Sequence, residues 1–359
     1  MTDSLAVVSP APMEGHGAYN RSSRVQAAGL SPAVPLLEQA AKTAALELLP
    51  QPVIVADYGS SEGHNSLGPL AVAIRTLRKR AGPGRAIWVV HTDLPDNDFT
   101  ALFQTLAVDP NSYLRGDSAV FASAIGRSFY EQLLPSSSVT LAWSSWAVQW
   151  LSRLPAQIPD QVQIAYSQDP AARAAFARQA AEDWRTFLVH RGCELRPGGK
   201  LVVLTMGVDE AGNFGYRPLL EAMYAALLDM VREGFLRAEE ARRMVIPTVG
   251  RSRSDFVEPF ADSGSFNGLS IEQMEVFLSE DRIWAEFENN GDARGFGAQW
   301  AAFSRASVFP TLAAGLETGR AGSRAITFVN RLEADVAARL AASPERMLIP
   351  LAKLLFLKQ

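Results

Sequence analysis

Short runs of apolar and β-branched residues alternate with longer Ala/Leu/Arg-rich segments, and this alternation most restricts what the chain can fold into. We predict strands over Val53–Asp57, Ala86–Thr92, Val139–Trp143 and Leu201–Met206. We predict helices over Gly68–Arg80, Asp98–Leu106 and about Ala171–Arg191. Strands separated by helices require right-handed crossovers and a mostly parallel sheet. The pattern therefore predicts an open α/β fold whose ligands bind at the carboxyl ends of the strands.

The rhythm changes after about residue 211, where helical periodicity dominates. We predict helices over Leu219–Glu233, Arg237–Met244, Ile271–Leu278 and Gln299–Phe309, and a further one over Ala325–Leu340. The run Met347–Phe356 is expected to return to the sheet. The predicted organisation is a flexible tail at 1–12, an α/β core at 13–211 and 321–359, and a helical cap at 212–320 that lines a pocket.

Composition excludes several functional classes. The net charge of −4 gives no basic surface of the kind that nucleic-acid-binding proteins use. Cys193 is the only cysteine, and the four histidines lack the spacing of a zinc site, so we expect neither disulfides nor a metal. No apolar run approaches the roughly 20 residues that span a bilayer. We expect a cytoplasmic protein without a nucleic-acid or membrane partner.

The stretch VIVADYGSSEGHNSL, residues 53–67, predicts a ligand site where the first strand ends. Gly59 and Gly63 frame a tight turn that opens a helix, and such turns bring the backbone close to a ligand. Nucleotide loops of dehydrogenases have GxGxxG, whereas this spacing is GxxxG with carboxylates at Asp57 and Glu62. Those carboxylates would repel a pyrophosphate, so a phosphate-free, cationic ligand such as S-adenosylmethionine (SAM) fits better. An ordinary strand–helix turn is the alternative.

Asp93 follows the second strand, where a carboxylate can accept hydrogen bonds from both hydroxyls of a ribose. Dehydrogenases use the same device, so Asp93 alone does not separate SAM from NAD. The missing GxGxxG and the acidic Glu62 argue against a NAD-dependent oxidoreductase. The Pro-Gly-Gly turn in LRPGGKLVVLTM is compatible with a methyltransferase, and AGPGRA is interpreted as a connector between a helix and a strand.

Taken in order, five segments resemble one family, the SABATH methyltransferases of salicylic acid, benzoic acid and theobromine. The segment GHGAYNRSSRVQ is similar to G-x-x-S-Y-A-x-N-S-x-x-Q, and ADYGSSEGHNSL to A-D-x-G-x-S-x-G-x-N-[ST]-L. The segment TDLPDNDFTALF is similar to N-D-L-P-x-N-D-F-N-x-x-F. The segments GRSFYEQLLP and WSSWAVQWLSRLP resemble G-S-F-Y-x-x-L-[FL]-P and H-S-S-Y-x-L-Q-W-L-S-x-x-P. The chain therefore resembles a divergent, bacterial-like member of this family.

The resemblance implies a Rossmann-like class I methyltransferase sheet with helices on both faces, an α-helical cap and often a homodimer. It also implies SAM as the methyl donor, with S-adenosyl-L-homocysteine (SAH) as the product. The cofactor-binding residues that we expect, with Gly59 from the turn itself, are Tyr19, Ser23, Asp57, Gly59, Asn65, Asp93, Leu94, Ser128 and Phe129. The acceptor-binding residues that we expect are Gln26, Trp146, Trp150, Met206 and Val249, of which Gln26 and Trp150 would donate hydrogen bonds to the acceptor carboxylate.

Departures from the family pattern concern the acceptor side. Trp146 and Val249 stand where relatives have tyrosines, and Trp143 stands where they have a histidine. Trp143, Trp146 and Trp150 would also share one face of a helix, which is the usual pattern of a packed core.

A carboxylic acid is an anion at neutral pH, because its pKa is about 4, and so needs no general base. The favoured activity is a carboxyl O-methyltransferase acting on a small aromatic or apolar acid. An N-methyltransferase of a small heterocycle and a cofactor-binding protein without turnover remain as alternatives.

Overall fold

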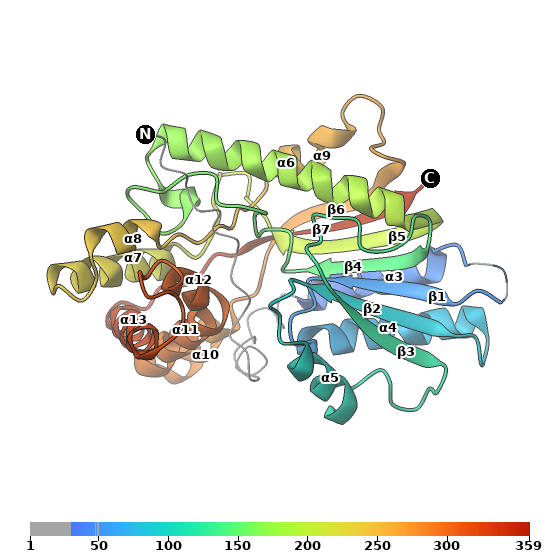
Figure 1. Cartoon of the computed structure of the whole chain (residues 1–359), viewed down its shortest axis with the longest axis horizontal. Coiled ribbons are helices and arrows are strands. Elements are labelled where there is room, and N and C mark those ends of the chain that lie inside the picture. Colours follow the sequence, from blue (N-terminus) through green and yellow to red (C-terminus); the bar gives the residue numbers. More distant parts are fainter. Residues whose placement is uncertain (1–29, 47, 49) are drawn as a thin grey trace.

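The computed structural model describes residues 30–46, 48 and 50–359, and its centre is a seven-stranded sheet with the order β3-β2-β1-β4-β5-β7-β6 (Figure 1). The strands are β1 (Val53–Tyr58), β2 (Ile87–Asp93), β3 (Val120–Gly126), β4 (Val139–Ser145), β5 (Leu195–Met206), β6 (Leu269–Leu278) and β7 (Pro350–Lys358). Strands β1 to β5 pair in parallel, and β7 lies antiparallel between β5 and β6. The predicted mostly parallel sheet is confirmed, as is the return of the chain to the sheet near its end.

Helices cover both faces of the sheet (Figure 1). A short 3-10 turn (Ser31–Ala33) leads into α3 (Val34–Thr43), and α3, α4 (His64–Ala81) and α5 (Phe99–Val108) pack on one face. The long helix α6 (Pro170–Glu194) covers the other face, together with the short α9 (Arg253–Val257) and a 3-10 turn (Glu258–Phe260).

The side chains of β1 contribute alternately to the cores on the two faces of the sheet. Val53 and Val55 point into the core beneath α3 and α4, whereas Ala56 and Tyr58 point into the core beneath α6. Successive side chains of a strand point to opposite faces, so a strand covered on both sides is a continuous apolar run.

A second group of helices lies beyond the carboxyl ends of β1 to β5, at the left of Figure 1. It contains α7 (Arg217–Arg232), α8 (Ala238–Arg243), α10 (Arg282–Asn290), α11 (Ala293–Ser307), α12 (Phe309–Ala313) and α13 (Ser323–Ala342). Helix α13 packs against α11 and α7. One hydrophobic core runs without a break from the sheet into this group.

Two sequence-based assignments of strands were wrong. The predicted helix over Ile271–Leu278 is instead most of β6, an edge strand held by antiparallel pairing with β7. Strand β3 was not predicted at all, because its sequence VFASAIG is short, rich in small residues and only half buried. The other predicted helices and strands are present, with ends that differ from the predicted ones by up to six residues, as for α11 and β5.

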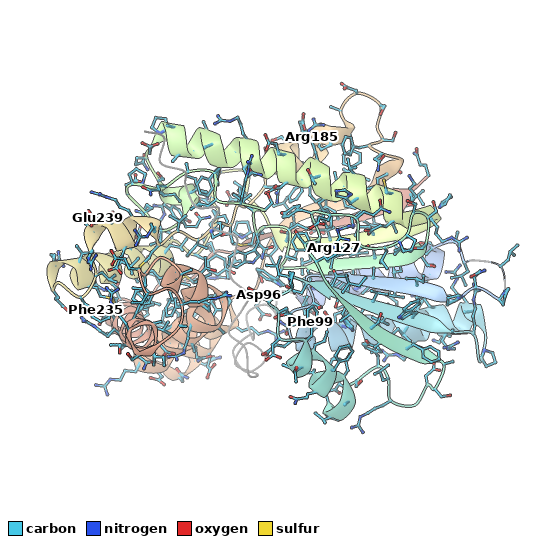
Figure 2. The ribbon with its side chains drawn as sticks, in the orientation of Figure 1. Asp96, Phe99, Arg127, Arg185, Phe235 and Glu239 are labelled. Carbon is cyan, nitrogen blue, oxygen red and sulfur yellow. The ribbon has the colours of Figure 1, made fainter. Side chains whose placement is uncertain are left out.

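Asp96, which Figure 2 labels between the sheet and the second group of helices, lies in the loop after β2. Its carboxylate accepts a hydrogen bond from Arg320, in the loop before α13, at 3.1 Å. Both side chains are solvent-exposed, so this contact contributes little stability. In the part of the chain that the structure describes, no helix is long and apolar enough to cross a membrane.

Candidate active site

The loop between β1 and α4 is tied to the end of β2. Gly59, with a φ of +86°, and Ser60 both donate their backbone N–H to the carbonyl of Thr92, at 2.9 and 3.0 Å. A Cβ at Gly59 would overlap the Cβ of Ala147, so only glycine fits this turn. The backbone N–H groups of Gly59 and Ser60 are therefore bonded within the protein. The side-chain hydroxyls of Ser60 and Ser61 remain without a hydrogen-bond partner among the described residues.

Asp57, at the end of β1, takes part in a buried chain of three side chains. Its Oδ2 lies 2.8 Å from Nδ1 of His91, which is its direct neighbour in the parallel register of β1 and β2. Nε2 of His91 lies 2.6 Å from the hydroxyl of Tyr113. Asp57, His91 and Tyr113 are 1%, 0% and 5% exposed. Burial, and then the negative charge of Asp57, raise the pKa of Tyr113 well above its ordinary value.

Asp93 is held at the next strand end by backbone groups. Its Oδ2 accepts the N–H of Ser61 at 2.7 Å, and its Oδ1 accepts the N–H of Leu94 at 2.8 Å. A carboxylate has about four lone-pair positions, so each oxygen can still accept a hydroxyl. Burial raises the pKa of Asp93 to about 6, against the lowering effect of the two backbone hydrogen bonds.

The segment that contains Ser128 and Phe129 follows β3 and is anchored from α6. Arg191, fully buried, donates hydrogen bonds to the carbonyls of Phe129 and Glu131 at 2.7 and 2.8 Å. Its guanidinium also pairs with Glu194 at 2.8 Å. These contacts fix the backbone of Phe129, and its ring lies near Gly59. A Cβ placed on Gly59 would be 3.9 Å from Cε1 of Phe129.

A turn over residues 146–150 follows β4 and contacts the β1–α4 loop through Ala147. Trp146 has a φ of +54°, which is strained for a bulky residue, and its backbone N–H donates to Leu204 on β5 at 2.9 Å. The carbonyl of Trp150 accepts the hydroxyl of Tyr130 at 2.6 Å. Several elements therefore hold the strained turn in one conformation.

Beyond this turn lies a cavity whose water-accessible space is about 80 Å³. Its walls come from the end of β5, from α7 and the residues before it, from α11 and the residue after it, from the turn after β4, and from loop residues near 163 and 246–248. They are Trp146, Gln149, Trp150, Gln163, Met206, Phe214, Tyr216, Leu219, Leu220, Met223, Ile246, Thr248, Phe303, Ser304, Ser307 and Val308. No charged side chain is among these described wall residues.

The structure brings most predicted site residues together. Asp57, Gly59, Asp93, Leu94, Ser128 and Phe129 lie on or just after β1, β2 and β3, which are neighbours in the sheet, and Asn65 lies in the first turn of α4. Trp146, Trp150 and Met206 line the cavity. Tyr19, Ser23 and Gln26, like the predicted tail at 1–12, lie outside the described residues.

Two expectations for the acceptor side need correction. Val249 does not line the cavity but a separate pocket beside α6, because its neighbour Thr248 bridges to Trp150 and turns inward instead. The three tryptophans do not share a helix. Trp143 lies on β4 and is buried in the core, whereas Trp146 and Trp150 lie in the turn after β4.

A family model described as SAM-dependent carboxyl methyltransferase matches residues 8–348. The chain belongs to this family. As expected from the resemblance, its relatives include the salicylate and benzoate enzymes.

Among curated relatives, Methyltransferase LUC1 of Fusarium sp. is 32% identical over 255 residues, covering 70% of this chain and 66% of that protein. The match thus spans slightly less than two thirds of the length of such fungal relatives. Salicylate carboxymethyltransferase of Clarkia breweri is 28% identical over 295 residues, covering 78% of this chain and 79% of that protein.

The fold matches a solved structure of loganic acid methyltransferase with SAH. The TM-score is 0.78 at 20% identity, covering 97% of this chain and 99% of the other. The Rossmann-like class I methyltransferase fold is therefore confirmed.

The residues at the strand ends suit the cofactor of this carboxyl methyltransferase family. The buried carboxylate of Asp57 suits a cationic group, and Asp93 retains capacity for ribose hydroxyls. The hydroxyls of Ser60 and Ser61, which have no partner among the described residues, add neutral hydrogen-bonding groups. No set of three or more His, Cys, Asp or Glu side chains able to hold a metal ion occurs among the residues described.

Sequence reasoning missed several residues of this family member's site. Tyr216, at the start of α7, lines the cavity, has a φ of +57° and is 6% exposed. Its ring stacks on Phe303 with centroids 6.0 Å apart, yet its hydroxyl has no hydrogen-bond partner among the described residues. His91 was noted only as a histidine without metal spacing, although its position two residues before Asp93 was a usable signal.

Proposed function

We propose that this protein methylates the carboxylate of a small apolar acid to its methyl ester, with SAM as methyl donor. The observation that carries the proposal is the uncharged cavity, whose wall includes Trp146 just after β4 and Met206 at the end of β5. Asp57 and Asp93 end β1 and β2 at the same edge of the sheet. Family membership supports the reaction type. The names of relatives that act on salicylic, benzoic and loganic acids support the carboxylate as acceptor.

The cavity wall suits an apolar acid with a single charged group. Leu219, Leu220 and Met223 from α7 face Phe303 from α11, so the body of the acceptor would be buried among apolar side chains. The amide groups of Gln149 and Gln163 are already hydrogen-bonded, to Trp146 and Thr248 respectively. A second charge on the acceptor would be buried without an ionic partner, at a large cost in free energy.

The acceptor carboxylate needs orientation more than activation. When bound, the cofactor supplies an electrophilic methyl group carried on a sulfonium. Trp150 lines the cavity, and its indole N–H makes no hydrogen bond to another described residue. In this proposal it donates to the acceptor carboxylate. Gln26 is the second donor in this proposal, on the resemblance alone. Holding two reactants in line can lower a barrier by roughly 7–11 kcal/mol.

The test is methyl transfer from isotopically labelled SAM to a panel of apolar carboxylic acids, with the corresponding amides as controls. We expect methyl esters from at least one acid and no transfer to the amides. Transfer only to ring nitrogens of a heterocycle panel would overturn the carboxylate as acceptor and favour the N-methyltransferase. SAM binding without transfer to either panel would favour the non-catalytic alternative.

Substitution of Trp150 tests the acceptor contact separately. Trp150→Phe keeps the ring but removes the N–H donor, so we expect kcat/KM for the acid to fall by about 10-fold or more, the value of one hydrogen bond to a charged group. The matched control is Trp88→Phe, because Trp88 is an exposed tryptophan on β2 whose N–H donates, among the described residues, to Ser123 alone. Equal kinetics for both variants would remove Trp150 from the proposal.

The division of the chain also remains a proposal. We assign all seven strands to the cofactor core, and helices α7, α8, α10, α11, α12 and α13 to the acceptor side. Compared with the predicted cap at 212–320, this assignment moves β6 into the core and α13 to the acceptor side. A homodimer and a cytoplasmic location stay predictions from the sequence.

A further inference from the structure

His91 is the one described side chain within hydrogen-bonding distance of the buried carboxylate of Asp57, with Nδ1 at 2.8 Å from Oδ2. Both residues face the core beneath α4, at paired positions of β1 and β2, and the neighbour of Asp57 on its other side is Trp143 of β4. A buried carboxylate that loses its hydrogen bond is strongly destabilised. The orientation of Asp57 therefore depends on His91.

The contact between His91 and Tyr113 decides where the ring proton lies. The hydroxyl of Tyr113 has no other hydrogen-bond partner among the described residues, so its proton is satisfied only if Nε2 accepts it. Burial and the charge of Asp57 raise the pKa of Tyr113, so the phenol stays protonated and remains a donor. With Nε2 accepting, the neutral ring carries its proton on Nδ1 and donates it to Asp57.

A neutral donor has a different effect from a lysine or arginine at the same place. It fixes the carboxylate in one position without cancelling its charge, so the full negative charge stays available for a cationic group of a ligand. In the proposed site Asp57 faces the methionine part of SAM, which carries an ammonium in both SAM and SAH. Only SAM carries the sulfonium as well.

We propose that His91, held by Tyr113, is a positioning residue that orients Asp57 toward the ammonium of the methionine part of the cofactor. The inference rests on the proposed cofactor site and adds to it two residues that do not contact the cofactor. It predicts an effect on cofactor affinity that is equal for SAM and SAH and absent for the acceptor acid.

The test is calorimetric titration of the whole protein with SAM and, separately, with SAH. His91→Leu removes the donor, and we expect both dissociation constants to rise by about 10- to 100-fold, as for a buried charged acceptor left unsatisfied. His91→Asn keeps an N–H near the place of Nδ1 and should stay within about 3-fold of wild type. Tyr113→Phe frees the tautomer and should raise both constants by about 3- to 10-fold.

The outcomes separate this inference from the proposed site. If Asp57→Asn leaves both dissociation constants unchanged, the cofactor site itself is wrong. If Asp57→Asn weakens binding but His91→Leu and Tyr113→Phe do not, the role of His91 is overturned. A loss confined to SAM would overturn the assignment to the ammonium, and should His91→Leu fail to fold, Tyr113→Phe decides.

Discussion

The proposed cofactor end and the proposed acceptor cavity lie on either side of the 146–150 turn, and their side chains are held in place in opposite ways. At the cofactor end, polar groups from neighbouring strand ends are fixed by backbone and side-chain hydrogen bonds, as for Asp57 and Asp93. In the cavity, uncharged and mostly apolar side chains are fixed by packing, and the hydroxyl of Tyr216 has no partner among the residues described. The difference indicates that the fold determines the cofactor, whereas individual side chains determine the acceptor.

The largest expected effect comes from a backbone position at the cofactor end. Gly59→Ala places a side chain at a positive φ and against Ala147, so we expect a loss of stability of about 2 kcal/mol or more and at least about a 30-fold weaker binding of SAM. Calorimetry and denaturant unfolding measure both effects.

Gly68→Ala is the matched control for this glycine. Gly68 lies inside α4, where a Cβ meets no atom within 4 Å, so the substitution should leave binding unchanged and stabilise the protein by up to about 1 kcal/mol. If Gly59→Ala changed stability and SAM binding no more than Gly68→Ala does, the conformation of Gly59 would not be required for binding SAM.

A smaller effect is expected from pH, and only at the cofactor end. Because the pKa of Asp93 in the ligand-free protein is about 6, this carboxyl is protonated below that pH and cannot accept from both ribose hydroxyls. The dissociation constant of SAM should rise by about tenfold per pH unit below about 6. Calorimetry between pH 5 and pH 8 measures it, and a constant affinity over this range would contradict the role of Asp93.

The same group has the opposite effect on the stability of the ligand-free protein. Folding raises the pKa of Asp93 from its ordinary value of 3.8 to about 6. The folded state therefore binds the proton more tightly than the unfolded chain does. This contribution to stability is present below about pH 4 and is lost as the pH rises through about 6. Asp93→Asn should remove the dependence.

The smallest effect is expected in the cavity. Tyr216→Phe removes a buried hydroxyl that has no partner among the described residues, so we expect a gain in stability of up to about 1 kcal/mol in the absence of acceptor. Tyr58→Phe is the control, because the hydroxyl of Tyr58 donates to Glu194 and its loss should destabilise by about 1–3 kcal/mol. Denaturant unfolding compares the two, and destabilisation by both would show that Tyr216 is bonded within the fold.

The same contrast explains which parts of the site could be predicted from sequence. Asp57, Gly59 and Asp93 follow strands directly, and parallel strands bring their carboxyl ends to one edge, so local patterns were sufficient. The cavity combines residues from six separate segments of the chain, and no local pattern reveals which side chains of α7 and α11 face inward. Tyr216 was missed for this reason.

Two errors show how a small local difference changes an assignment. Thr248 and Val249 are adjacent in an extended segment, so their side chains point to opposite sides. The prediction chose Val249, which lines the pocket beside α6, whereas its neighbour Thr248 lines the cavity. For β6, the apolar spacing of Ile271, Met274 and Leu278 suits a helix as well as a strand. The deciding partner, β7, is distant in sequence.

The position of β7 between β5 and β6 has a consequence for how the protein is made. Leu278 ends β6 and Pro350 begins β7, so during synthesis β6 leaves the ribosome 72 residues (350 − 278) before the strand that will hold it. Until then both β5 and β6 present unpaired edges, which are sites where nascent chains associate wrongly. Chaperone demand should therefore be concentrated in this late interval of translation.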